Sequence, residues 1–577
     1  MLQNCRQASL GKPLRRFWSP RKRQVLVKRR FGRGFATTFC ILPLVALLAG
    51  CSAPKDLRDA REEDPAAVIF EADELAMALR ASEVGSGLEN GDGSDGNDVP
   101  PGSAELRAPS GGTRPLLERP GAPFPSVRFL VLSDPHHLSP ALWETGDAFA
   151  RWLSTNDGKV LARSEDLLIA IERTVLAEHQ RTPLDFVAIT GDLTANGSVE
   201  GHREIAALAR RIGAAGVPVF VIPGNHDLRN PWAARFSGST AERVPSVSPE
   251  RFAAMYGEAG YDAAVSRSPD DLSYRIDLGD RLSLLMLDTS ISSRNEVLGY
   301  PQPTGAVSTR QSAWLRQELS AIAEDGRAPL VFMHHNLLSH GRTRGYGSLQ
   351  YVVDEAPRLA RLLWDGGAPV VFTGHLHARN TTGLRGQAGE WMYDVAAGAV
   401  SVYPHEYRRV AIDSRGRLKM EPRALFGFPG GDDAFRRWAL ATYLSDTTRA
   451  FTDRLEDELP AAHPGDDLGD VLCAGVSPMF AVDGECRAEA ELDGLARYLA
   501  VWSILHRSGV DSAGAVERVA AVAPGLALAA ERWRTVAPER FTRLTYAWSV
   551  DPPPSDGTIT INLATGYWRE GWEASEG

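Results

Sequence analysis

The chain has 577 residues, of which 43% are hydrophobic and 24% are charged, an ordinary composition for a soluble globular protein. Residues 1–50 hold eleven of the 63 Lys and Arg and no Asp or Glu, so the remaining 52 basic and 73 acidic residues give the rest of the chain a net charge of −21. A body that is so acidic is a poor general binder of nucleic acid, and no nucleic-acid polymer is expected as a partner. The length predicts two folded domains together with export and linker segments.

The first fifty residues have the layout of an export signal. A basic stretch at residues 21–33 precedes an apolar stretch at 35–49, which is shorter than the roughly 20 residues that a membrane-spanning helix needs. The sequence LAGC at residues 48–51 resembles a bacterial lipobox, and the resemblance implies that Cys51 becomes the lipidated first residue of the mature protein. We expect a lipoprotein signal peptide at residues 1–50 and export to the cell envelope, either periplasmic or on the outer cell surface. A short anchor helix with an incidental cysteine is the alternative.

Residues 51–124 are predicted to be a tether that follows the lipidated cysteine. Residues 82–121 are rich in Gly, Ser, Asp, Glu and Pro and contain no aromatic residue. Such a segment cannot bury enough apolar surface to offset the conformational entropy that ordering would cost. The sequence therefore predicts a disordered, acidic and glycine-rich link between a membrane anchor and the folded body.

From residue 125 to residue 428, short apolar runs alternate with helical patterns. The runs are rich in β-branched and aromatic residues, which predicts buried strands at residues 128–133, 186–190, 217–222, 282–287, 330–333 and 370–373. Helices are predicted to begin at Ser164, which two acidic residues follow, and at Ser308, which has Gln311 at the spacing of a capping box. This alternation predicts an α/β layered domain with its active site at the carboxyl ends of the strands.

Residues 429–577 are predicted to form a mainly helical C-terminal domain. Apolar side chains recur on one helical face in two stretches, Leu440, Leu444, Thr447, Phe451 and Leu455, and then Leu492, Leu495, Leu499, Trp502 and Leu505. After Cys51 the remaining cysteines are Cys473 and Cys486, an even pair of the kind that commonly forms a disulfide in exported proteins. Two unrelated buried thiols are the alternative.

Candidate metal ligands follow five of the apolar runs. They lie in DPHH at residues 134–137, GD at 191–192, GNHD at 224–227, HHN at 334–336 and GHLH at 374–377. Because the carboxyl ends of parallel strands meet at one edge of a sheet, we expect these Asp, Asn and His side chains to gather there. Eight of the 13 histidines lie in or beside these motifs, a concentration that ordinary core histidines would not produce.

The residue types in these motifs indicate which metals could bind. Sites that mix imidazole, carboxylate and amide oxygen suit Zn²⁺, Mn²⁺ or Fe better than Ca²⁺ or Mg²⁺. More than four candidate ligands point to two divalent metal ions. Such a pair, roughly 3.5–4 Å apart, can activate a bridging hydroxide and hold the oxygens of an in-line phosphoryl displacement.

The order D-x-H, G-D, G-N-H-D, a further His and G-H-x-H resembles the calcineurin-like metallophosphoesterase family over about residues 127–410. The resemblance implies an α-β-β-α sandwich. It also implies ligand roles for individual residues: Asp134, His136 and His377 for the first ion, Asn225, His334 and His375 for the second, and Asp192 as a bridge between them.

The same resemblance implies catalytic roles for two residues of the third motif. His226 would contact the phosphoryl group or protonate the leaving oxygen, and Asp227 would orient His226. His334 is preferred to His335 as the ligand because it directly follows the apolar run. His137 and His335 keep an open role, since each could equally support the ligands from behind.

Longer strings in the motifs are similar to those of secreted bacterial cyclic-nucleotide phosphodiesterase-like members of the family. That similarity implies a two-metal phosphodiesterase acting on cyclic nucleotides or similar small diesters. A broad phosphomonoesterase or nucleotidase with the same site is the first alternative, and a non-catalytic binding module on the same fold is the second. The expected partners are a small phosphoester substrate and, through the lipid, a membrane; the oligomeric state is open.

Overall fold

The computed structural model describes residues 121–156, 158–340, 351–385, 390–458, 496–501, 503, 559–564 and 568–570. The expected signal peptide, Cys51, nearly all of the tether, Cys473 and Cys486 lie outside these residues. In the part that is described, no helix is long and apolar enough to cross a membrane.

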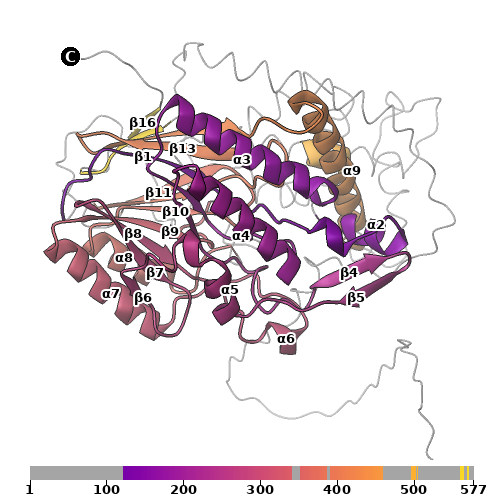
Figure 1. Ribbon diagram of the computed structural model, residues 1–577, viewed down its shortest axis with the longest axis horizontal. Helices are drawn as coiled ribbons and strands as arrows, with labels where there is room; N and C mark the ends of the chain where they lie inside the picture. The colour runs from indigo at the N-terminus through magenta and orange to yellow at the C-terminus, as the bar shows by residue number, and fades with distance from the viewer. Residues whose placement is uncertain are drawn as a thin grey trace, which may run out of the picture. The chain divides into compact units, whose positions relative to one another are not determined.

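Within the described residues, two seven-stranded sheets make up most of the fold (Figure 1). The first sheet has the order β16 (Trp568–Glu570), β15 (Ile559–Asn562), β14 (Arg417–Ala424), β13 (Glu406–Ile412), β1 (Val127–Leu132), β2 (Phe186–Ile189) and β3 (Val219–Val221). The second has the order β11 (Asn380–Arg385), β12 (Trp391–Ala396), β10 (Val370–Thr373), β9 (Ala328–Met333), β8 (Leu282–Leu287), β7 (Tyr274–Leu278) and β6 (Ser266–Arg267). A separate hairpin pairs β4 (Ala234–Ser237) with β5 (Thr240–Arg243).

Each sheet contains a run of neighbouring parallel strands, so several strands end at the same edge. Strands β1, β2 and β3 are parallel in the first sheet. Strands β8, β9, β10 and β12 are parallel in the second. The pairs that join β1 to β13, β14, β15 and β16 in succession are antiparallel in the first sheet. In the second sheet, the pairs made by β11, β7 and β6 are antiparallel.

Aromatic side chains form the layer between the two sheets. The ring of Phe129 on β1 lies 4.6 Å from that of Phe186 on β2, and 5.9 Å and 5.3 Å from those of Phe332 on β9 and Phe372 on β10. Because side chains alternate along a strand, the neighbours Val331 and Val371 lie in the core on the other face of the second sheet.

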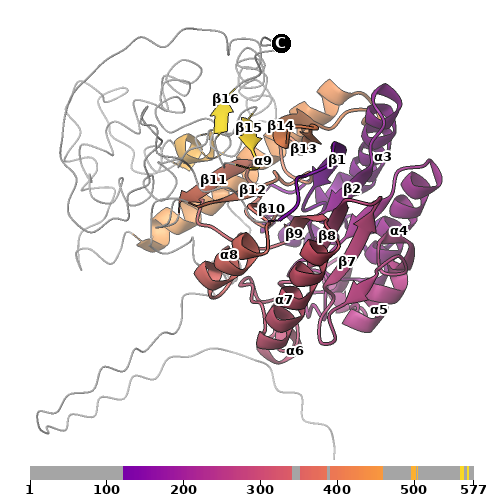
Figure 2. The same cartoon turned by 90° about the vertical axis from the view of Figure 1, so that its left-hand side faces the viewer.

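Helices cover the outer faces of both sheets (Figure 2). The α-helices of the fold include α2 (Asp147–Leu153), α3 (Ser164–Arg181), α4 (Val199–Ala214), α5 (Pro249–Met255), α6 (Asn295–Leu298), α7 (Thr309–Glu324), α8 (Ala356–Asp365) and α9 (Asp432–Glu458). Helices α3 and α4 lie against the first sheet, and α7 and α8 pack on the second. The predicted helix start at Ser164 and the predicted capping box of Ser308 and Gln311 are both confirmed.

The predicted strands and the α-β-β-α layering are therefore confirmed.

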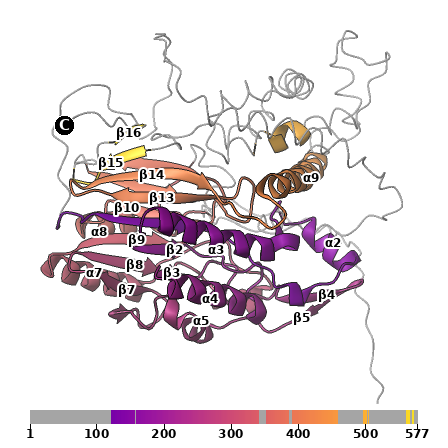
Figure 3. The same ribbon diagram turned by 45° about the horizontal axis from the view of Figure 1, so that its top comes forward.

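The C-terminal region differs in one respect from the sequence-based prediction. Its helix α9 is present and buries Phe435, Leu440 and Tyr443 in the same core as the sheets. In addition, β15 pairs with β14 and β16 pairs with β15, so the far end of the chain extends the first sheet (Figure 3). The helical periodicity of the region gave no sign of these strands.

Candidate metal centre

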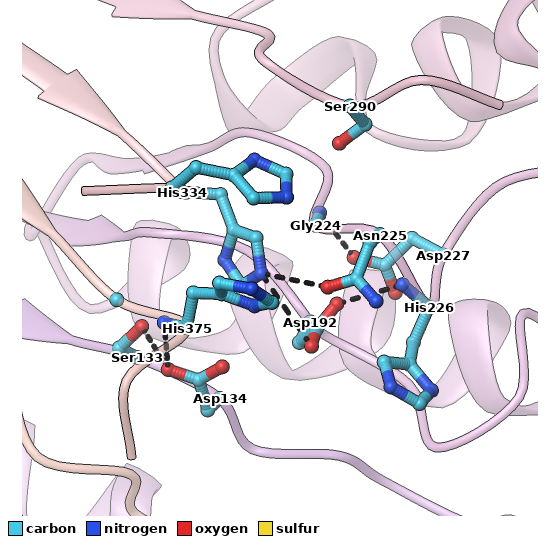
Figure 4. A network of polar contacts seen from close by, with 12 residues as sticks. Ser133, Asp134, Asp192, Gly224, Asn225, His226, Asp227, Ser290, His334 and His375 are labelled. Atoms are coloured by element: carbon cyan, nitrogen blue, oxygen red, sulfur yellow. Dashed lines mark hydrogen bonds and ion pairs between the residues drawn. The ribbon is translucent and has the colours of Figure 1, made fainter. Parts of the chain in front are cut away.

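The five predicted motifs follow the carboxyl ends of parallel strands. Asp134 comes after β1, Asp192 after β2, Asn225 after β3, His334 after β9 and His375 after β10. Figure 4 shows their side chains converging on one region. The parallel strands of the two sheets explain this convergence, because they end at the same edge of the sandwich.

A first group of potential ligand atoms comes from Asp134, His136, Asp192 and His377, all within 4.8 Å of one another. Nε2 of His136 lies 2.9 Å from Nε2 of His377 and 3.5 Å from Oδ2 of Asp192. Nε2 of His377 lies 3.3 Å from Oδ1 of Asp134. This is the set that the family resemblance implied for the first ion, together with its bridging carboxylate.

A second group lies beside the first and contains His334, His335 and His375, again within 4.8 Å. Nε2 of His334 lies 3.2 Å from Oδ1 of Asn225 and 3.5 Å from Oδ2 of Asp192. The amide oxygen of Asn225 thus completes a second set of donors. Oδ2 of Asp192 is 3.5 Å from an imidazole nitrogen in each group, which is the position that a shared ligand requires.

Backbone strain is concentrated at these residues. Asp134, His136, Asp192, His375 and His377 all have positive φ, between 42° and 64°. Residues other than glycine rarely adopt this backbone conformation. Where they do, the strained residues are commonly found at functional sites. The surrounding strands and hydrogen bonds therefore hold the side chains in positions that a relaxed backbone would not favour.

Hydrogen bonds from other strand ends fix Asp134. Its Oδ2 accepts from the Ser133 hydroxyl at 2.5 Å and from the backbone N–H of His375 at 3.1 Å. The Ser401 hydroxyl donates to its backbone carbonyl at 2.6 Å. Ser401 has no part in the motifs, so the sequence offered no means of predicting this contact.

The unsatisfied polar atoms of the site fit metal binding. Oδ1 of Asp134, Nε2 of His375 and Nε2 of His335 are buried and have no hydrogen-bond partner. Leaving buried polar atoms unpaired costs free energy, and cations bound at the two ligand groups would satisfy the carboxylate of Asp134 and the imidazole of His375. The donors are imidazole, carboxylate and amide oxygen, which is the ligand chemistry of a transition-metal site.

Electrostatics within the site keep the ligands in different protonation states. Burial would raise the pKa of Asp192, but the rings of His334, His226 and His136 hold it well below its usual range. Burial and the neighbouring His334 lower the pKa of His375 to about 3, so its imidazole is neutral and able to bind a metal. Burial also opposes protonation of His334, but the carboxylates of Asp192 and Asp134 raise its pKa to about 9. An incoming cation must therefore displace a proton from His334.

His226 is held beside the first ligand group, and its ring lies 5.0 Å from that of His136. Its backbone N–H donates to Oδ1 of Asp192 at 2.8 Å. Its Nδ1 lies 3.0 Å from the carbonyl oxygen of Ala195, which can only accept, so Nδ1 carries a proton. Nε2 is then the nitrogen that remains for a substrate.

The expected role of Asp227 needs a correction. Its carboxylate is not hydrogen-bonded to the ring of His226 and instead accepts from the backbone N–H groups of Leu193, Thr194 and Gly224, at 3.0, 2.9 and 2.8 Å. Asp227 thus ties together the loops that follow β2 and β3, while Ala195 orients His226. A backbone carbonyl has no signature in the sequence, which is why this role was assigned to the neighbouring acid.

The histidines with open roles are placed differently from one another. His335 lies in the second ligand group, but its Nδ1 bonds the Thr289 hydroxyl at 2.8 Å, and His334 is the one beside Asn225 and Asp192. His137 points to α4, where its Nε2 contacts Glu204. His137 therefore supports the strand end, and it belongs to neither ligand group of the described residues.

Two glycines allow the strand ends to approach this closely. A Cβ on Gly224 would overlap the backbone nitrogen and Oδ1 of Asp192. A Cβ on Gly374 would overlap the hydroxyl of Ser133, which holds Asp134. Glycine is required at both positions because any side chain would displace a predicted ligand.

Comparison with known proteins finds similarity to phosphoesterases. Residues 127–379 match the calcineurin-like phosphoesterase family. A Haemophilus influenzae protein named 3',5'-cyclic adenosine monophosphate phosphodiesterase CpdA is 25% identical over 44% of this chain and 70% of its own length. A Fibrobacter succinogenes protein named probable cyclic nucleotide phosphodiesterase is 27% identical over 35% of this chain, and the chain spans 60% of that relative's length. Among solved structures, a dimetal phosphatase from Danio rerio aligns with 52% of this chain and 96% of its own, at 15% identity and a TM-score of 0.36.

Proposed function

Because residues 127–379 match the calcineurin-like phosphoesterase family, we propose that this chain hydrolyses phosphoester bonds with the help of two divalent metal ions. The observation that carries the proposal is the position of Asp192, whose Oδ2 is 3.5 Å from His136 and 3.5 Å from His334. One carboxylate oxygen borders both ligand groups, as a bridging ligand must.

Seven residues would hold the ions. Asp134, His136 and His377 would bind one, Asn225, His334 and His375 would bind the other, and Asp192 would be shared. The mixture of nitrogen and oxygen donors suits Mn²⁺, Fe or Zn²⁺. When bound, such ions supply Lewis-acid stabilisation of the phosphoryl oxygens and lower the pKa of an attacking water.

The protein's own groups would position the substrate and handle the leaving group. The Ala195 carbonyl holds His226 with Nδ1 protonated, so Nε2 is the atom that faces the leaving oxygen. Nε2 would donate a proton to that oxygen when the ring is in its imidazolium form, which leaves the neutral ring with its proton on Nδ1. Asp192 holds the backbone of His226 at 2.8 Å, which ties the acid to the bridging ligand. Proton donation matters most for alkoxide leaving groups, because an unprotonated alkoxide leaves poorly.

We propose small phosphodiesters, cyclic nucleotides among them, as the substrate class. The names of two relatives support this, as does the similarity of the longer motif strings to cyclic-nucleotide phosphodiesterases. The test is hydrolysis of bis(p-nitrophenyl) phosphate against p-nitrophenyl phosphate with added Mn²⁺, with a chelator and Asp192→Asn as controls. Chelator-sensitive diester cleavage that Asp192→Asn abolishes is the expected result.

Other outcomes of that assay point elsewhere. Faster cleavage of the monoester would make the enzyme a phosphomonoesterase or nucleotidase that uses the same site. Bound metal without turnover of either substrate would indicate a binding protein.

We also propose that the protein is exported and anchored by a lipid at Cys51, on the strength of the basic, apolar and LAGC segments at residues 21–51. Cell fractionation tests this. The wild-type chain should follow the membrane fraction and Cys51→Ala should not; equal distribution of the two would refute the anchor.

A further inference from the structure

An exposed tryptophan lies next to His226. The indole of Trp232 and the imidazole of His226 have their ring centroids 6.2 Å apart and are tilted by 59°. Trp232 is 36% exposed, and it is the aromatic member of the four large hydrophobic side chains that are exposed among the described residues. An aromatic side chain of this size is normally buried, so its exposure beside the reactive histidine needs a reason.

Trp232 makes two hydrogen bonds, one from its indole and one from its backbone. Its Nε1 donates to the carbonyl oxygen of Gly299 at 3.1 Å, and its backbone N–H donates to Oδ1 of Asn230 at 2.9 Å. The buried Asn230 in turn donates from Nδ2 to the carbonyl oxygen of His226 at 2.8 Å. The same short turn thus fixes the indole and the imidazole, and Pro231 restricts the backbone between them.

The indole lies on the side of the site where the leaving group of the proposed reaction would be. His226 is the common neighbour of His136, at 5.0 Å between ring centroids, and of Trp232, at 6.2 Å. A phosphoryl group at the ligand groups, with its leaving oxygen at Nε2 of His226, would extend its remaining part past this imidazole. Tyr351 also lies near the site, but its ring is beside His375, 5.2 Å away, and so it borders the other ligand group.

We propose that Trp232 is a stacking platform that binds a planar aromatic part of the substrate, such as a nucleobase, beside His226. The inference rests on the proposed function and narrows its substrate class from small phosphoesters to those that carry a flat ring. An indole fixed by its own hydrogen bonds loses little conformational freedom when a ring stacks on it. Stacking of one base on an aromatic side chain strengthens binding about 5- to 150-fold.

A pair of ligands that differ only in the base tests the platform. Adenosine 5'-monophosphate and ribose 5-phosphate share the phosphate and the sugar, so the ratio of their dissociation constants isolates the contribution of the ring. Calorimetric titration of the Mn²⁺-loaded full chain gives both constants, and neither ligand contains the diester bond of the proposed reaction. The variants are Trp232→Ala, Trp232→Phe and Trp232→Leu, with Leu384→Ala as a control at another exposed hydrophobic position.

The wild type and Leu384→Ala should bind the nucleotide about tenfold or more tightly than the sugar phosphate. Trp232→Phe should keep part of this preference, and Trp232→Ala and Trp232→Leu should lose it while still binding ribose 5-phosphate as the wild type does. Leu fills much of the indole's space without offering a flat ring, so it separates stacking from an effect on folding.

An unchanged preference in Trp232→Leu would overturn the proposal, and so would a wild type that binds the two ligands equally or binds neither. These results are independent of the hydrolysis assay. A protein that prefers the nucleotide but cleaves no phosphoester would keep the platform and lose the proposed activity.

Discussion

The carbonyl oxygen of Ala195 lies 3.0 Å from Nδ1 of His226. Because a carbonyl only accepts, this contact fixes which ring nitrogen is protonated and leaves Nε2 for the leaving group. The loop after β2 therefore does two things: it places Asp192 between the ligand groups and, three residues later, sets the tautomer of the histidine that follows β3. The proposed metal centre and the proposed general acid are parts of one arrangement of strand ends.

A first prediction concerns the leaving group. His226→Ala should lower kcat for diesters that release an alkoxide by about 10²–10⁴-fold, because these need a proton from the enzyme. Diesters that release p-nitrophenolate, which leaves readily without a proton, should lose much less. The measurement is kcat for alkyl and p-nitrophenyl diesters in the wild type and the variant. An equal loss on both kinds of substrate would show that His226 does not act as an acid.

A second prediction concerns Gly224. In Gly224→Ala the new Cβ would overlap Oδ1 and the backbone nitrogen of Asp192, so the bridging carboxylate must move and the bound metal should fall from two ions toward one. Gly213→Ala on α4 is the matched control, since its Cβ would meet no atom within 4 Å and alanine favours a helix by about 1 kcal/mol. Elemental analysis of the two purified variants gives the answer; two ions in Gly224→Ala would contradict the tight packing described.

A third prediction concerns the corrected role of Asp227. Asp227→Asn replaces an acceptor oxygen with an amide that faces backbone N–H groups, so it should lower the free energy of unfolding by about 2–4 kcal/mol. Metal affinity should fall about 10- to 100-fold, because the loops that carry the ligands lose the hydrogen bonds to Asp227 that hold them together. The leaving-group dependence should stay as in the wild type, since Ala195 and not Asp227 orients His226.

Urea denaturation, metal titration and the substrate series measure these three effects, with the exposed Asp280→Asn as a control. A variant with wild-type stability that behaves like His226→Ala toward alkyl diesters would restore the original assignment of Asp227 as the residue that orients His226.

The sequence predicted those parts of the site that depend on repeated local patterns. Apolar runs fixed the strands, and Asp134, Asp192 and His375 directly follow such runs, so the convergence of their side chains follows from the parallel order of the strands. The positive φ values at these residues were not predictable, because they result from contacts between strands that are far apart in the chain.

Other features depended on contacts that no pattern in the neighbouring sequence signals. Asp227 is next to His226 in the sequence, but its carboxylate is directed toward the N–H groups of two loops. Strand β15 is only four residues long and its partner β14 precedes the whole C-terminal region, so no periodic pattern signalled the pairing. Trp232 lies outside the family motifs, and only its exposure in the fold distinguishes it.

A fourth prediction concerns pH. His405 is buried, with the rings of Phe435 and Phe428 at 5.2 and 5.6 Å, and burial lowers its pKa to about 4, with Arg436 adding to the shift. In the unfolded chain the imidazole has a pKa near 6.5. Between about pH 6.5 and pH 4, His405 therefore binds a proton in the unfolded chain and stays neutral in the folded chain. The contribution of His405 to stability is therefore complete above pH 6.5 and decreases by about 3 kcal/mol as the pH falls to 4.

His405→Asn tests this, because Asn tolerates the left-handed backbone at this position, where φ is 65°. The variant should be less stable than the wild type at pH 7.5 and should lose less stability on acidification. Urea denaturation from pH 7.5 to pH 4 gives the slope of the unfolding free energy against pH for the wild type and for the variant. Parallel slopes would show that His405 does not take up the proton.

Metal reconstitution of the chelator-treated protein is the measurement that tests the central claim most directly. Mn²⁺ would be added in steps while bound metal and hydrolysis of bis(p-nitrophenyl) phosphate are followed together. If Asp192 joins two sites, full activity should return only as the second equivalent binds, and Asp192→Asn should bind less metal and stay inactive. Full activity with no metal or with one equivalent, or a wild-type rate in Asp192→Asn, would contradict a two-metal phosphoesterase.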